Sequence, residues 1–227
     1  EGRRLLITGV VTTDSIAYAT AAAVLAHGGE IVLSGLGRDL ERTREAAARL
    51  GPGIDVIEAD LTVAADLARL RDDLAQRWSG LDGALHAVAF APREALAGDF
   101  LAAGPEAVGR AFHTSTHSYA ALASVVADLA PDRGASIVGL DFDAAGAWPV
   151  YNWMGVCKAG LEAVNRYVAR DLGPRRIRSN LIAAGPIHTR AASGIAEFER
   201  LTDAWAAGSP MAWDPDDARP VADAACF

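Results

Sequence analysis

Several features that define particular classes of protein are missing from this sequence. Its 227 residues include two cysteines, Cys157 and Cys226, which are too few for a disulfide framework and typical of an intracellular protein. No apolar run approaches the ~20 residues that a membrane-spanning helix needs. The amino-terminal segment enters a strand-like run at once, without the pattern of a signal peptide. We therefore expect a cytoplasmic protein with no membrane partner.

Basic patches are also missing. The formal net charge is −8, and the arginines are scattered along the chain. Because nucleic-acid-binding proteins usually concentrate positive charge on one face, we expect no nucleic-acid partner. The composition, 51% hydrophobic and 22% charged, suits one domain over residues 1–227 with a full core.

Two pairs of side chains have a spacing that metal sites use, but neither pair has further ligands nearby. Asp141 and Asp143 are expected to be solvated turn residues. His113 and His117, one turn apart on a predicted helix, are expected to lie on a helix face or at an interface. We therefore predict no metal site.

Short apolar runs alternate with helical patterns along the chain. The runs typical of strands are 3–8, 30–34, 54–59, 84–90, 135–140 and 177–183. The runs typical of helices are 15–27, 40–50, 64–78, 105–130 and about 151–172, and residues 214–217 look like the capped start of another helix. This alternation predicts an α/β, Rossmann-type fold: a doubly wound parallel sheet with helices on both faces.

Such a sheet binds its ligand at the carboxyl ends of its strands. The first strand ends at Gly9, and the helix after it, capped by Asp14 or Ser15, offers a terminus that can hold a pyrophosphate. The turn lacks G-x-G-x-x-G, so an ordinary loop is equally consistent. Asp60 follows the third strand and suits either an adenine amine or a helix cap, and Thr189 follows the sixth strand with a free hydroxyl.

Tyr151 and Lys158 are seven residues apart, which is nearly two helical turns, so both side chains would project from one face. A cation near a phenol favours the phenolate and strengthens the hydroxyl as a donor. Such a pair can hold a carbonyl oxygen that becomes negative during a reaction. Cys157 is expected to be a packed, inert thiol.

Together these motifs resemble the enoyl-[acyl carrier protein] reductases of the short-chain dehydrogenase/reductase superfamily, in particular the bacterial NADH-dependent type. The family's Gly-x5-Ser-x-Ala loop appears as Gly9, Ser15 and Ala17, and its Tyr-x6-Lys pair as Tyr151 and Lys158. Residues 137–143 and 151–154 are similar to the mycobacterial member, whereas residues 190–195 are more like the enteric type.

The resemblance implies a role for each site residue. Tyr151 would hydrogen-bond the thioester carbonyl, Lys158 would hold the ribose hydroxyls, and Phe142 would lie beside the substrate and the hydride path. The implied contacts to NADH are Gly9, Val11, Ser15, Ile16, Asp60, Leu61, Ala87, Ala89, Lys158, Ile187 and Thr189. The implied acyl pocket is Phe90, Met154, Ile195 and Phe198, with substrate-binding helices at about 190–208 and with Trp205 and Trp213 as a lid or as ordinary packing.

The implied reaction is reduction of the 2,3 double bond of a trans-2-enoyl thioester, carried by acyl carrier protein or coenzyme A, in fatty acid or related biosynthesis. A ketoreductase on the same fold is an alternative, although residues 139–142 lack the serine that ketoreductases of this superfamily usually carry. A non-catalytic dinucleotide-binding protein is a second alternative. The superfamily pairs its subunits through the helix at 105–130 and the next one, so we expect a homotetramer.

Three positions depart from the family pattern. The family's His-Ser-Ile-Gly appears as His86-Ala87-Val88-Ala89, which removes a hydroxyl and adds a methyl beside the expected coenzyme. No carboxylate follows the second strand, where sites for NAD often carry one, and Arg38 suits a 2′-phosphate, so NADPH stays possible. The seventh strand of the family has no counterpart, so we expect either a further tail or an open sheet edge.

Overall fold

Six parallel strands form the sheet of the computed structural model, which describes residues 2–227. The strands are β1 Arg4–Thr8, β2 Glu30–Gly35, β3 Asp55–Glu58, β4 Gly83–His86, β5 Ala135–Asp141 and β6 Ile177–Ala183. Their order is β3-β2-β1-β4-β5-β6, and every neighbouring pair is parallel. The chain reverses direction across the sheet between β1 and β4, where doubly wound folds bind their ligands. The predicted fold class is confirmed.

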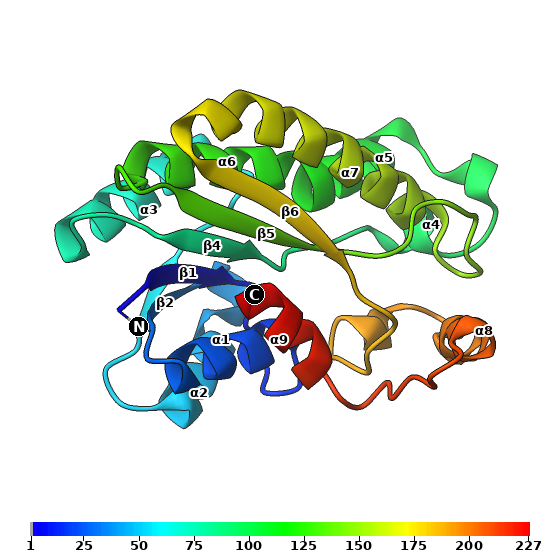
Figure 1. The fold of residues 1–227 in the computed structure, drawn as a ribbon. Coiled ribbons are helices and arrows are strands. Elements are labelled where there is room, and N and C mark those ends of the chain that lie inside the picture. Colours follow the sequence, from blue (N-terminus) through cyan, green and yellow to red (C-terminus); the bar gives the residue numbers. More distant parts are fainter. Residues whose placement is uncertain (1) are drawn as a thin grey trace.

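Helices cover both faces of this sheet (Figure 1). One face carries α1 Ile16–Ala26, α2 Leu40–Leu50 and α9 Arg219–Cys226, and the other carries α3 Ala64–Arg77, α5 Pro105–Phe112, α6 Ser118–Leu129 and α7 Asn152–Leu172. The short helices α4 Arg93–Leu96 and α8 Glu199–Gly208 lie beyond the carboxyl ends of the strands. Short 3-10 turns span Gly37–Asp39, Phe100–Ala102, Gly173–Arg175 and Ala192–Gly194. Within residues 2–227, no helix combines the length and apolar character needed to cross a membrane.

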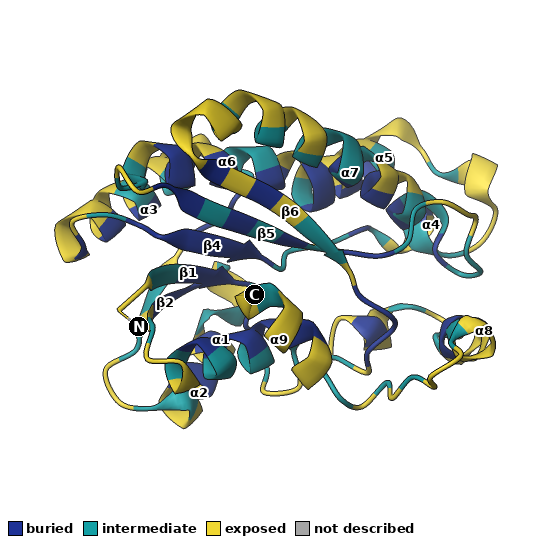
Figure 2. Cartoon of the chain, viewed as in Figure 1, coloured by how far each residue is buried: buried dark blue, intermediate teal, exposed yellow. Residues whose placement is uncertain are grey.

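The core fills both sides of the sheet, because successive strand residues point to opposite faces (Figure 2). Leu6 and Val32 are fully buried on the side of α3, α6 and α7, while Ile7 and Leu33 are buried on the side of α1 and α2. This arrangement explains why the strands are apolar at nearly every position. Packing on both faces holds the strand ends in place, and the loops that follow the strands therefore start from fixed positions.

The helical pattern at 105–130 was expected to be one helix, but the structure interrupts it. Residues His113–His117 form a π-helical turn between α5 and α6. The wider turn places two hydroxyls inside the protein: Thr116 donates to the Cys157 carbonyl at 2.8 Å, and Ser115 lies 2.9 Å from both the N–H and the carbonyl of Phe90. A π turn adds a residue to the helix, and such turns often mark functional positions.

Two expected boundaries are also corrected. The fourth strand ends at His86 rather than at residue 90. After His86 the backbone leaves the strand pairing: the Ala87 N–H donates to the Thr8 hydroxyl at 3.2 Å, and the Phe90 N–H donates to the Ser115 hydroxyl. The last helix begins at Arg219 rather than near residue 214. Asp214 and Asp217 instead close two short turns, each accepting from a backbone N–H two residues later at 2.9 Å.

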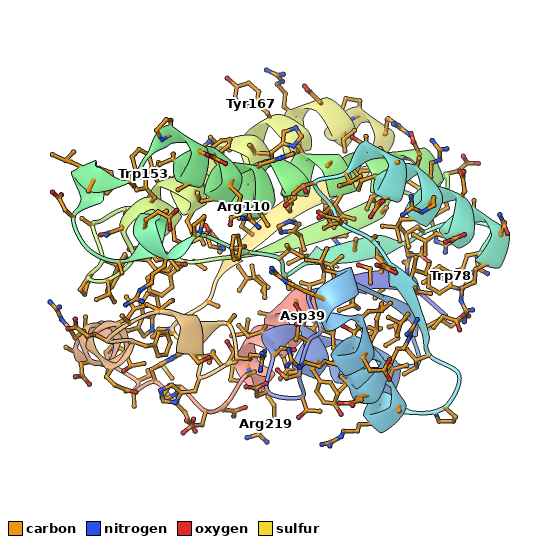
Figure 3. The ribbon with its side chains drawn as sticks, turned by 180° about the vertical axis from the view of Figure 1, so that it is seen from behind. Asp39, Trp78, Arg110, Trp153, Tyr167 and Arg219 are labelled. Carbon is orange, nitrogen blue, oxygen red and sulfur yellow. The ribbon has the colours of Figure 1, made fainter. Side chains whose placement is uncertain are left out.

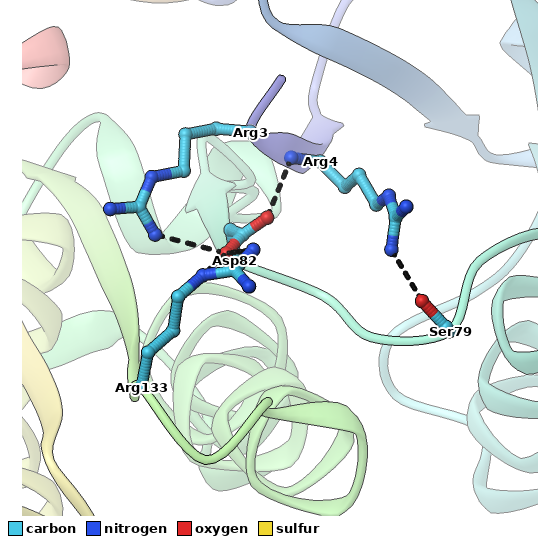
Figure 4. A network of polar contacts seen from close by, with 5 residues as sticks. All are labelled: Arg3, Arg4, Ser79, Asp82 and Arg133. Atoms are coloured by element: carbon cyan, nitrogen blue, oxygen red, sulfur yellow. Dashed lines mark hydrogen bonds and ion pairs between the residues drawn. The ribbon is translucent and has the colours of Figure 1, made fainter. Parts of the chain in front are cut away.

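An acidic side chain ties together the amino ends of the strands, opposite the expected site (Figure 4). Asp82 is 6% exposed and accepts from the Arg4 N–H at 3.0 Å, from Arg3 at 3.1 Å and from Arg133 at 2.6 Å. Burial alone would raise the pKa of Asp82, but these hydrogen bonds outweigh it and hold the pKa below its usual value.

One edge of the sheet is open within residues 2–227. β6 is the last strand in the order and pairs with β5 alone. Beside it, a hollow of about 790 Å³ runs under β4–β6 to the residues that end α9. In the described residues, the position after β6 that a seventh strand would take is not filled by any strand.

Candidate functional site

The turn after β1 brings the backbone of two strand ends together. Gly9 has a φ of +83°, and a Cβ placed on it would lie 2.1 Å from the Ala87 carbonyl oxygen. Only glycine combines this conformation with so close an approach. Ser15, rather than Asp14, caps α1 by accepting from the Tyr18 N–H at 3.1 Å. The first turn of α1 carries no acidic side chain, so its amino end is electrostatically suited to an anion.

Asp60 closes a turn and does not cap a helix. Its carboxylate accepts from the Thr62 N–H at 2.8 Å and from the Thr62 hydroxyl at 2.6 Å, which closes a turn. α3 begins at Ala64 and is capped by Val63, so Asp60 is not its cap. Leu61 beside it is buried. The adenine contact of Asp60 and Leu61 stays a prediction.

The end of β4 is occupied by a buried histidine. The His86 ring lies 2.8 Å (Nε2) from the Ser118 hydroxyl and packs edge-on against Tyr119, with centroids 5.5 Å apart. Burial, together with the charge of Lys158, lowers the pKa of His86 to about 3, so the ring is neutral. Ala87 packs on Gly9, whereas Ala89 is exposed at the same strand end.

Tyr151 stands directly before α7 in a strained stretch of backbone. Its neighbours Val150 and Asn152 both have positive φ, +57° and +36°, which side-chain-bearing residues rarely adopt. Tyr151 is 8% exposed, and its ring lies 5.1 Å from the Phe142 ring. Burial raises its pKa, and the charges of Asp141 and Cys157 raise it further. The phenol is therefore protonated, and the expected shift toward phenolate is not present.

Lys158 is the only lysine in the chain, which has 20 arginines. It is 6% exposed on the second turn of α7, and its ammonium donates to the Leu140 carbonyl at 2.7 Å. Burial lowers its pKa, while the charges of Asp141 and Cys157 raise it. Cys157 is buried as expected, and burial raises the pKa of its thiol.

Asp141 contradicts the expectation of a solvated turn residue. It ends β5, is 6% exposed, and one of its carboxylate oxygens, Oδ1, has no hydrogen-bond partner in the described chain. Asp143 does behave as a turn residue, since it accepts from the Ala145 N–H at 3.2 Å and from the Trp148 indole at 3.1 Å. Among the residues described, no cluster of three or more His, Cys, Asp or Glu side chains is arranged to hold a metal.

Phe142 is the centre of an aromatic cluster beyond β5. Its ring lies 5.3 Å from Trp148 and 5.2 Å from Trp205, and Trp213 packs on Trp205 at 6.2 Å. Met154 is buried in this cluster, and Ile195 and Phe198 pack against it. Three of the four predicted acyl-pocket residues therefore meet Tyr151 and Phe142 in one apolar region.

The fourth predicted pocket residue, Phe90, lies apart from that cluster. The guanidinium groups of Arg38 and Arg110 stand over its ring, at 5.4 and 5.0 Å. In Figure 3, Arg110 lies in the layer of α5, and Asp39, the neighbour of Arg38 in the chain, lies in the layer below. Phe90 thus lies near the end of β2, and its acyl contact stays a prediction.

A carboxylate also reaches the end of β2, which the sequence did not suggest. The sheet register pairs Gly35 with Glu58, the last residue of β3. A Cβ placed on Gly37 would lie 2.6 Å from a carboxylate oxygen of Glu58. Since β3 is the neighbour of β2, the strand order typical of a doubly wound sheet is the signal that could have found this residue.

The segment after β6 packs closely against the aromatic cluster. Residues 184–187 are buried, and Gly185 lies against the indoles of Trp205 and Trp213, where a Cβ would be 2.6 Å from either. The Trp213 indole donates to the Pro186 carbonyl at 2.8 Å. Thr189 accepts from the Ala192 N–H at 3.2 Å, so its hydroxyl hydrogen is available to another acceptor.

Comparison with known proteins places the chain in a family. A family model described as enoyl-(acyl carrier protein) reductase matches residues 9–227. An NADH enoyl-[acyl-carrier-protein] reductase of Mycolicibacterium smegmatis is 38% identical over the whole chain and 88% of its own length. Similar reductases of Neisseria meningitidis (41% identical, 93% of this chain, 82% of their own) and Escherichia coli K12 (37%, 88% and 77%) also match. The chain therefore belongs to the enoyl-[acyl carrier protein] reductase family.

Proposed function

We propose that this protein reduces the 2,3 double bond of a trans-2-enoyl thioester, with NADH as coenzyme and acyl carrier protein as carrier of the acyl chain, in the cytoplasm. The observation that carries the proposal is that Tyr151 and Lys158 are both buried beside the carboxyl end of β5. Tyr151 lies against Phe142, and Lys158 holds the backbone of Leu140. Membership of the reductase family supports the same reaction.

The strand ends fit a dinucleotide. Gly9 lets a phosphate approach the backbone, and the amino end of α1 presents N–H groups without an acidic side chain. Lys158 uses one donor on Leu140, so two remain for ribose hydroxyls. Val11, Ser15, Ile16, Ile187 and Thr189 lie along these same loops and are proposed to line the coenzyme.

NADH, when bound, supplies the hydride. Reduction places negative charge on the thioester oxygen, and a positioned donor at such an oxygen stabilises the transition state by roughly 3–4 kcal/mol. Tyr151 is suited to this role because its raised pKa keeps the phenol protonated. Lys158 orients the coenzyme, and the apolar surroundings of Phe142 and Met154 exclude water from the reacting carbon atoms.

The decisive assay compares two thioesters. We expect the protein to oxidise NADH with a crotonyl thioester and to leave an acetoacetyl thioester unchanged. The reverse preference would identify a ketoreductase, and NADH binding without turnover of either would identify a non-catalytic dinucleotide-binding protein. Acyl carrier protein and coenzyme A thioesters, assayed in parallel, establish the carrier.

The choice between NADH and NADPH is proposed to depend on two opposed charges at the end of β2. Glu58 suits the 2′-hydroxyl of NADH and repels a 2′-phosphate, whereas Arg38 attracts that phosphate. Arg38 is partly neutralised by Asp39, which it contacts at 3.3 Å. The remaining balance supports a preference for NADH.

A second copy of the chain is the proposed partner of an exposed apolar face on α5 and α7. Phe112 and Val156, 41% and 42% exposed, border a hollow of about 680 Å³ that His113, His117 and Trp153 also line. An apolar patch of this kind suits a homotypic interface, and two such contacts give a homotetramer. We expect Phe112→Glu to lower the mass measured by light scattering. Met211→Glu, at an exposed position elsewhere, is the control.

A further inference from the structure

A buried carboxylate next to the catalytic pair has no role in the reaction described above. Asp141 ends β5 with 6% of its surface exposed, and its Oδ1 atom has no hydrogen-bond partner in the described residues. An ionised carboxylate in such a place costs free energy unless a nearby positive charge offsets it. A positive charge that offsets this cost is therefore expected near Asp141.

The nearby positive charge is Lys158. Its ammonium donates to the carbonyl of Leu140, the residue before Asp141, so the cation is fixed at the end of β5 where the carboxylate stands. No other lysine exists in the chain, and none of the ion pairs that the described arginines form involves Asp141. Each group is buried, and the charge of each favours the ionised form of the other.

We propose that Asp141 is a positioning residue of the reductase: its carboxylate is the counter-charge that keeps buried Lys158 protonated and held at Leu140, ready to donate to the ribose hydroxyls of the coenzyme. The role of Lys158 in this inference rests on the proposed function. The counter-charge itself is a property of the protein without any ligand.

The pKa values of the two groups agree with this geometry. The pKa of Asp141 is raised to about 6, mainly by burial, and the charge of Lys158 opposes part of that rise. Burial lowers the pKa of Lys158, and Asp141 opposes that change.

Other titratable groups act on the same pair from the elements around it, namely Glu162, Tyr151 and Cys157 on or beside α7, Asp143 after β5 and His86 at the end of β4. Glu162 and Asp143 raise the pKa of Asp141. The neutral His86 ring adds no charge near neutral pH. Lys158 is therefore the cation that favours ionised Asp141.

The single lysine makes a direct test simple. Protein labelled with ¹³C at the lysine side chain, and free of lysine in any tag, gives one lysine side-chain signal by NMR, whose pH titration reports the pKa of Lys158. We expect Asp141→Asn to move the midpoint of that titration down by roughly one pH unit or more, as removal of a close opposite charge does. Asp143→Asn, which removes a carboxylate charge two residues away and keeps one of its two acceptor oxygens, is the matched control and should leave the titration in place.

A second measurement follows coenzyme affinity. NADH fluorescence titrations across pH should show binding lost at high pH as Lys158 deprotonates. In Asp141→Asn this loss should move to lower pH by the same amount as the lysine titration, because one protonation equilibrium governs both. Thermal melting confirms that each variant is folded, and Asp141→Ser replaces Asp141→Asn if the latter is not.

Each outcome decides the proposal. An unchanged Lys158 titration in the Asp141 variants, or an equal change in Asp143→Asn, overturns it. If the wild type binds no NADH, the proposed function fails, while the lysine titration of the ligand-free protein still decides the counter-charge. If Asp141→Asn alters the titration of Lys158 but leaves the pH dependence of NADH binding unchanged, Asp141 is the counter-charge of Lys158 but this charge does not control coenzyme binding.

Discussion

The carbonyl oxygen of Ala87 lies directly against the α-carbon of Gly9, so closely that a Cβ there would be 2.1 Å from it. This contact joins the end of β1 to the loop after β4, at the point where the sheet reverses its winding. The position proposed for the coenzyme pyrophosphate therefore depends on the absence of one methyl group.

Gly9→Ala should destabilise the protein by roughly 3 kcal/mol, because a positive φ and a clash with backbone add together. Gly53→Ala is the matched control: Gly53 has a similar φ of +77° but no atom within 4 Å of its Cβ position. That variant should lose only about 1 kcal/mol. Urea unfolding measures both, and equal losses would show that the contact with Ala87 is not important.

Tyr151→Phe should lower kcat by roughly 10²–10³ while leaving the KM for NADH nearly unchanged, because one donor to the developing oxyanion is removed. Steady-state kinetics with a crotonyl thioester gives both constants. Tyr167 lies on α7, the helix that follows Tyr151, and is 61% exposed. Tyr167→Phe removes the same kind of hydroxyl and should have no effect. Full activity in Tyr151→Phe would contradict the mechanism.

His86 should make stability depend on pH. Its folded pKa of about 3 lies below the unfolded value of 6.5, so the unfolded chain binds more protons between these values. The contribution of the neutral ring is present above pH 6.5 and is lost as the pH falls toward 3. The difference in unfolding free energy between wild type and His86→Gln should therefore fall by about 3 kcal/mol from pH 7 to pH 4.

The raised folded pKa of Asp141 makes the unfolding free energy change with pH in the opposite direction between about pH 4 and 6. Because Asp141 is present in both proteins, its effect cancels, and the difference in unfolding free energy reports His86 alone. Denaturant unfolding at several pH values supplies it. A difference that is constant with pH would show that the ring is not buried in neutral form.

Glu58→Gln should weaken discrimination between the coenzymes. Without the carboxylate, the KM for NADPH should fall and that for NADH should rise, the latter by roughly tenfold, as expected for a lost hydrogen bond to a charged group. Asp55→Asn, at the amino end of the same strand, is the control. Unchanged KM values for both coenzymes would place the ribose elsewhere.

Much of the fold could be predicted from the sequence, because burial in the core gives strands and helices recognisable patterns of apolar residues. The strands are buried on both faces and read as apolar runs, and the six predicted strands all occur. The π turn was missed because His113–His117 continues a helical pattern, and its distortion satisfies Ser115 and Thr116 through residues distant in the chain. Local sequence carries no information about those partners.

The site was predicted less completely for the same reason. Asp141 looked like a turn residue from its neighbours, although the alternation of buried residues in β5 extends to it. Whether it is buried depends on what packs over the end of the strand, and that is α7, from the next part of the chain. Glu58 is brought to the end of β2, in the proposed coenzyme region, only by the order of the strands.

The solitary lysine also gives the surface an unusual chemical character. Arginine supplies every exposed side-chain cation in residues 2–227, so reagents that acylate primary amines find no accessible target on the folded side chains. Acylation of Lys158 would then report the opening of α7 from the sheet, and its rate would measure how often the catalytic region opens to solvent.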